Sequence, residues 1–150
     1  MGTLMNKDRI SRIFGTLVFL LHCIPAFAQE DQLDFLKQFV LGEYHVVGKY
    51  PESDQAYQGK IKFQMIDNNL EVVRTIGSIQ VKGKAAIDSV TADAVKILRV
   101  QFNENDIAYE TTYLINSDLD NYARLSGFIY FQNKKTSKPG LEALFHVPEN

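Results

Sequence analysis

The sequence predicts an all-β protein, an eight-stranded antiparallel up-and-down barrel preceded by one short helix. Three observations lead to this prediction. From Gly42 onward, apolar residues alternate with polar ones at a period of two. Short polar turns with no helix separate the apolar runs, so neighbouring strands should pair antiparallel. An open sheet of eight strands would leave two unprotected edges, which closure into a barrel removes. A two-sheet sandwich is the alternative, although it usually carries longer connections.

The first 28 residues predict a secretory signal peptide. Lys7 and Arg9 lie in a basic segment, the run from Ile13 to Ile24 is apolar, and small residues lead to a cleavage site after Ala28. The apolar run is too short for a membrane span. We therefore expect an exported protein, periplasmic or secreted, in which residues 29–150 form a single domain.

Cysteine use and charge narrow the expected partners. The only cysteine, Cys23, lies in the predicted leader, where lipid attachment is the alternative reading. Cleavage after Ala28 leaves no thiol or disulfide. The chain has a formal net charge of −2 and no basic cluster, so we expect no nucleic-acid partner.

Residues Glu30 to Leu41 predict the helix. Leu33, Leu36 and Val40 repeat at intervals of three and four residues and form one apolar face. Gly42 can end the helix in a left-handed conformation. We expect the helix to plug or flank one mouth of the barrel.

The strands follow from the alternation and from the turn residues between the runs. For example, Asp67, Asn68 and Asn69 separate the second run from the third, as a hairpin turn would. The eight predicted strands are 42–50, 57–65, 70–76, 79–87, 94–102, 107–115, 122–131 and 141–147.

The glycines of these strands carry a resemblance. Four short motifs resemble those of small exported bacterial barrels of the lipocalin and avidin-like superfamily. In chain order they are Gly42-x-Tyr44-x-Val46-x-Gly48, Tyr57-x-Gly59, Leu125-x-Gly127 and Pro139-Gly140-x-Glu142. The chain departs from that pattern because it has no tryptophan; Tyr44 and Ile129 stand where those proteins place one. The resemblance implies an eight-stranded barrel that binds a small ligand or inhibits another protein, and that is seldom an enzyme.

Alternation assigns side chains to the inside of the barrel. The barrel interior is either filled by side chains or holds one small ligand. The hydroxyl-bearing residues Tyr109, Thr111 and Tyr113 lie on one strand and need buried partners. Core packing is the alternative role for them. The residues expected to contact a small apolar ligand are Tyr44, Tyr57, Phe63, Tyr109, Thr111 and Tyr113, and the wider inner set adds Met65, Leu98, Val100, Phe102, Ile107 and Phe145.

The outside of the barrel offers a second surface. Tyr122, Phe128 and Tyr130 share the outer face of the seventh strand, which suggests a homodimer or a protein partner. His45 and His146 are expected to face outward on the first and last strands, without further metal ligands. The carboxylates expected outside are Glu43, Glu71, Glu110 and Glu142.

Arg74 and Arg124 lie within strand-like runs, and the alternation leaves their facing open. Arg74 inside the barrel would need a carboxylate or an anionic ligand. No nucleophile elbow, phosphate loop or metal motif occurs, so we expect no catalytic residue, no cofactor and no enzyme activity. The leading expectation is an exported barrel that binds a small apolar molecule; the alternative is a protein-binding or inhibitor module of the bacterial envelope.

Overall fold

The computed structural model describes residues 25–90, 95–115 and 124–148, with helical side chains described from Leu33 onward. The predicted leader up to Ile24, and Tyr122 of the predicted partner surface, lie outside these residues. The chain divides into two compact units: residues up to Leu36 belong to the first, and Lys37 onward, with all eight strands, to the second.

Within the part of the chain that the structure describes, one helix precedes the strands. Helix α2 spans Pro25–Val40 and so begins five residues before the predicted start. It ends before Gly42, whose φ of +126° lies in the region that only glycine adopts readily. Within the second unit, the Tyr44 hydroxyl donates to the carbonyl of Val40 at 3.1 Å. This bond satisfies one of the carbonyl groups that a helix end leaves free.

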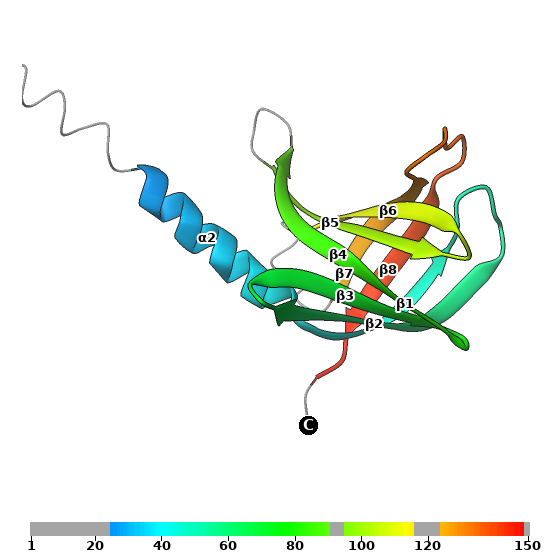
Figure 1. The fold of residues 1–150 in the computed structure, drawn as a ribbon, viewed down its shortest axis with the longest axis horizontal. Helices are drawn as coiled ribbons and strands as arrows, with labels where there is room; N and C mark the ends of the chain where they lie inside the picture. Colours follow the sequence, from blue (N-terminus) through cyan, green and yellow to red (C-terminus); the bar gives the residue numbers. More distant parts are fainter. Residues whose placement is uncertain (1–24, 91–94, 116–123, 149–150) are drawn as a thin grey trace, which may run out of the picture. The chain divides into compact units, whose positions relative to one another are not determined.

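Eight antiparallel strands close into a barrel in which each strand pairs with its sequence neighbours and β1 pairs with β8, as predicted (Figure 1). The strands are β1 Gly42–Lys49, β2 Ala56–Ile66, β3 Asn69–Ile76, β4 Ile79–Val90, β5 Val95–Glu104, β6 Ile107–Leu114, β7 Arg124–Phe131 and β8 Gly140–His146.

Tight turns fix the register of three hairpins. Asp67 and Asn68 both have positive φ, and so do Asn105 and Asp106, which is the arrangement of a type I′ turn. Gly77 alone has positive φ between β3 and β4, as a type II′ turn requires. Turns of these types match the right-handed twist of the strands, so they hold each two-residue connection in register.

The facing of β8 differs from the prediction. Phe145 was expected inside but is 43% exposed, whereas Glu142 was expected outside and is completely buried. His146 also lies on the inner side, with its ring centroid 5.1 Å from that of Tyr44. The reason is the register with β1, which places His146 opposite Tyr44. Leu141, Ala143 and Phe145 form the more apolar of the two alternating sets of β8, so the sequence of this strand alone favours the wrong facing.

The structure also shows which way Arg74 and Arg124 face. Arg74 points inward and is completely buried, while Arg124 is exposed. Ile107, expected inside, is 37% exposed because it begins β6 directly after the turn. The remaining inner residues form one apolar core that includes Val46, Leu98 and Ile129.

Candidate functional site

The centre of the barrel is organised around Glu142 on β8. Its neighbours across the sheet are Gly48 on β1 and Gly127 on β7. One strand further on either side lie Tyr57 and Tyr113. A Cβ atom at Gly48 would lie 2.9 Å from the Tyr57 hydroxyl, and one at Gly127 would lie 2.8 Å from Cδ1 of Tyr113. The glycines therefore leave room for both tyrosine side chains to reach Glu142.

Both tyrosines donate to the Glu142 carboxylate, Tyr57 to Oε1 and Tyr113 to Oε2. Arg74 on β3 approaches the same carboxylate with two nitrogens: Nη2 lies 2.6 Å from Oε1 and Nη1 lies 3.2 Å from Oε2. The Arg74 guanidinium also lies over the Phe102 ring, 4.0 Å from its centroid. This is a bidentate, charge-assisted pair completed by two neutral donors. We call these four residues, Arg74, Glu142, Tyr57 and Tyr113, the central network.

Burial and charge act in opposite directions on Glu142. Burial raises the pKa of its carboxyl group, but the positive charge of Arg74 and hydrogen bonds from Arg74, Tyr113 and Tyr57 outweigh burial, so the pKa lies below its usual value of 4.5. Burial and the neighbouring carboxylate raise the pKa of Tyr113. Glu142 is therefore ionised and both tyrosines are neutral at pH 7. A saturated carboxylate without solvent access is poorly suited to acid–base catalysis.

Aromatic rings fill the mouth of the barrel where β1 ends. The Tyr50 ring lies 4.5 Å from Tyr57 and 5.5 Å from Tyr109, centroid to centroid. Its hydroxyl donates to Oε1 of Glu104 at 2.5 Å, so Tyr50 reaches from the end of β1 to the end of β5. These two strands lie on opposite sides of an eight-stranded ring, which means that Tyr50 spans the mouth.

The six residues predicted to contact a ligand all point inward, but they do not form one wall. Tyr57 and Tyr113 belong to the central network, and Tyr109 packs in the aromatic mouth. Tyr44 and Phe63 meet edge to face at 5.7 Å near the other end. Thr111 is completely buried between Val100 and Ile129 on the neighbouring strands. The sequence prediction did not include Glu142 and Glu104 among the inner residues. The available signal for Glu142 was Arg74, because an inward arginine needs a carboxylate.

The outer surface of the barrel carries a group of exposed apolar side chains and a group of exposed lysines. Val47 on β1, Phe128 on β7, and Leu141 and Phe145 on β8 are each 43–52% exposed, and Phe128 is paired directly with Leu141. We call these four residues the outer apolar face. Outward lysines lie on β2, next to β1, and on β4, across the ring from β8: Lys60, Lys62, Lys82 and Lys84. Phe128 and Tyr130 are thus exposed on the same strand, as predicted, and Tyr130 lies beyond Phe128, opposite Glu110.

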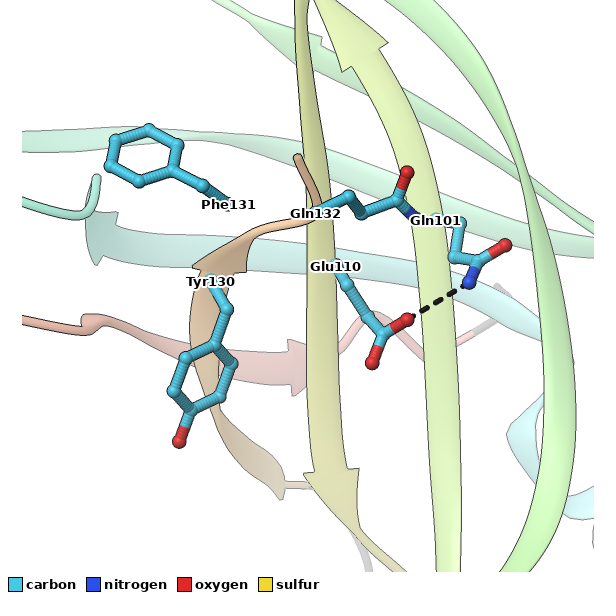
Figure 2. A pocket seen from close by; sticks show the side chains of 5 residues that line it. All are labelled: Gln101, Glu110, Tyr130, Phe131 and Gln132. Carbon is cyan, nitrogen blue, oxygen red and sulfur yellow. Dashed lines mark hydrogen bonds between the residues drawn. The ribbon is translucent and has the colours of Figure 1, made fainter. Parts of the chain in front are cut away.

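A hollow of about 410 Å³ lies beside the outer apolar face, lined by Gln101, Glu110, Tyr130, Phe131 and Gln132. Figure 2 shows the polar side chains of Gln101, Glu110 and Gln132 gathered over β5 and β6, with the Tyr130 ring beside them and the Phe131 ring directed away. Gln101 Nε2 donates to Glu110 Oε2 at 2.9 Å.

Within residues 25–90, 95–115 and 124–148, no group of three or more His, Cys, Asp or Glu side chains is arranged to hold a metal ion. His45 and His146 lie on opposite sides of the barrel wall, so they are not placed to share a metal as outward neighbours. No helix in the described part of the chain is both long and apolar enough to cross a bilayer.

Comparison with known proteins supports the fold. No protein-family model matches the chain, and no curated protein sequence matches it. Among solved structures, the chain is similar to a redesigned β-barrel, with a TM-score of 0.50 and 14% sequence identity over 75% of this chain and 96% of that one. At this level of identity the similarity shows the barrel architecture alone.

Proposed function

We propose that this protein is a non-catalytic barrel that acts by binding another protein through its outer apolar face. One observation carries the proposal: Val47, Phe128, Leu141 and Phe145 are about half exposed on three neighbouring strands, β7, β8 and β1. If a side chain of this size has roughly 150–200 Å² of surface, the four expose on the order of 300–400 Å². Apolar patches of about 300–600 Å² are often functional on soluble proteins.

Charge supports the choice of this face. The centre of a protein interface is depleted in charged residues. At the centre of this face, Val47 lies in register with Ala143 and Ser126, which are both uncharged. The charged neighbours lie at its two ends, Lys49 beside Leu141 and Arg124 beside Phe145. A stable interface buries about 800 Å² per partner, so the apolar patch supplies about half and a polar rim must supply the rest.

Three further statements belong to the proposal. Export follows from the leader pattern of residues 1–28, and distant membership of the lipocalin and avidin-like superfamily follows from the glycine and tyrosine motifs within a closed barrel. The proposed absence of enzyme activity is supported by a central carboxylate that is saturated by its neighbours. The predicted small apolar ligand stays a second prediction, because Tyr57 and Tyr113, which were expected to contact it, already contact Glu142.

Site-specific photo-cross-linking in the cells that make the protein tests the proposal. A benzophenone amino acid replaces Phe128 in one variant and Lys82, on the opposite wall, in a control. We expect a covalent protein adduct from position 128 that disappears when Leu141→Lys is added. Mass spectrometry of the adduct separates a second copy of the chain from another protein. Equal labelling from both positions, or no protein adduct from position 128, would contradict the proposal.

A further inference from the structure

The hollow beside Tyr130 has the residue types of a polar binding site. Its volume of about 410 Å³ falls within the range of about 300–1,000 Å³ that is usual for small-molecule sites. It presents one carboxylate, two primary amides and one phenol, from Glu110, Gln101, Gln132 and Tyr130 (Figure 2). Three of these groups come from β5, β6 and β7, and Gln132 directly follows β7, where its backbone N–H donates to the carbonyl of Ala108 at 2.9 Å. The barrel wall therefore holds their backbones in place.

Glu110 is held in place before any ligand arrives. Its Oε2 accepts from Gln101 at 2.9 Å, and its Oε1 accepts from Arg99 Nη1 at 3.1 Å. Arg99 is held in turn by Asp88, with Nε 2.7 Å from Oδ2. The resulting ladder crosses β4, β5 and β6 on the outer wall. Side chains that are already ordered lose little conformational freedom when a ligand binds.

The lining selects a class of ligand. An anion would meet the Glu110 carboxylate. A cation would meet a carboxylate whose charge Arg99 already offsets, since Arg99 and Glu110 are paired at 3.1 Å. An apolar molecule would cover the amides and the carboxylate without replacing their hydrogen bonds to water, which is unfavourable. A neutral molecule with several hydroxyl groups and one apolar face avoids all three problems.

We propose that this hollow binds a neutral saccharide. Sugar hydroxyls both donate and accept, so they match the amides of Gln101 and Gln132, which also do both, and the carboxylate of Glu110, which accepts. The C–H face of a sugar ring is apolar and fits against the exposed side of the Tyr130 ring, which is 38% exposed and has an apolar body with a polar tip. This site is separate from the outer apolar face because Phe128 and Leu141 do not line the hollow.

Titration of the whole protein with sugars, followed by nuclear magnetic resonance, tests the inference. The probes are maltose, cellobiose, lactose and the disaccharide of N-acetylglucosamine. We expect at least one of them to shift the side-chain amide signals of Gln101 and Gln132 in a saturable manner. Tyr130→Ala should weaken that binding by about ten-fold, which corresponds to about 1.4 kcal/mol. Phe128→Ala, two residues away on the same strand, should leave it unchanged.

Two controls distinguish other ligand classes. Glu110→Gln should weaken saccharide binding only a few-fold, because the amide oxygen still accepts; abolished binding, together with equal shifts from tetramethylammonium, would point to a cation site and overturn the inference. Equal shifts from the neutral peptide Gly-Asn-Gly would overturn it as well. So would the lack of a saturable shift from all four sugars, provided that circular dichroism shows the barrel folded. Cross-linking from position 128 is unaffected by any of these outcomes.

Discussion

The central network makes a quantitative prediction about stability. Glu142→Gln keeps the shape of the side chain but leaves the guanidinium of Arg74 completely buried without a counter-charge. Removing one partner of a buried ion pair costs about 3–5 kcal/mol. The free energy of unfolding of a domain is usually about 5–15 kcal/mol, so this variant should lose a large share of it. Urea unfolding followed by far-ultraviolet circular dichroism measures the loss; the chain has no tryptophan to report it by fluorescence.

The double variant Arg74→Met with Glu142→Gln separates charge from packing. Arg74→Met alone leaves the Glu142 carboxylate buried with only the two tyrosine donors and should also lose about 3–5 kcal/mol. With both charges removed, we expect a protein within about 2 kcal/mol of the wild type, because neutral replacements of buried ion pairs are often tolerated. The two single effects should therefore be strongly non-additive.

The control is a pair of the same charge types on the surface. Lys60 Nζ lies 2.7 Å from Glu43 Oε1, but their side chains are 58% and 40% exposed. Glu43→Gln should leave the urea midpoint nearly unchanged, since exposed ion pairs contribute little. If Glu142→Gln behaves like Glu43→Gln, or if the double variant loses the sum of its single effects, then the network does not stabilise the barrel as its geometry implies.

Three other predictions concern pH and packing. Because the pKa of Glu142 lies below 4.5, its contribution to stability is present above that pH and is lost as the pH falls through the lowered value; urea midpoints of the wild type should therefore fall more steeply in acid than those of the double variant. Burial raises the pKa of Tyr44 to about 12, so its contribution to stability is complete below pH 10 and is lost as the pH rises through 12. Burial also raises the pKa values of Tyr50, Tyr57, Tyr109 and Tyr113, so the expected signal is a difference: tyrosinate absorbance of the wild type minus that of Tyr44→Phe should rise by one tyrosine near pH 12. Gly127→Ala brings a Cβ within 2.2 Å of the Thr112 carbonyl oxygen and should lower the free energy of unfolding by about 3 kcal/mol or more. Gly77→Ala has open space around the new Cβ but a φ of +58°, so it should lower that free energy by only about 1–2 kcal/mol. Thermal unfolding measures both losses.

The fold could be predicted because its signals are local. Alternation sets the facing within a strand, and turn pairs such as Asp67 and Asn68 set where each strand ends. Neither signal requires knowledge of distant residues. The strand ends differ from the prediction by a few residues; β4, for example, continues to Val90 rather than ending at Ile87.

The central network could not be predicted in the same way. Leu141, Ala143 and Phe145 form a better apolar set than Glu142, Leu144 and His146, so alternation alone placed Glu142 outside. The pairing of β8 with β1, about 100 residues earlier in the chain, reversed that facing. Arg74 gave the opposite hint, because an inward arginine needs an inward acid. Weighing both residues together would have favoured the observed arrangement.

Alternation also links the inside of the barrel to its outside. Gly48, Gly127 and Glu142 face inward, and their chain neighbours Val47, Phe128 and Leu141 face outward. Glu142 with its two neighbouring glycines and most of the outer apolar face are therefore the two sides of the same three strands. Tyr57 and Tyr113 reach Glu142 only because the two glycines allow it, and the bonds they form tie β2 and β6 to β8 across β1 and β7. A rigid wall lowers the conformational cost of docking, because its apolar side chains are already positioned for a partner.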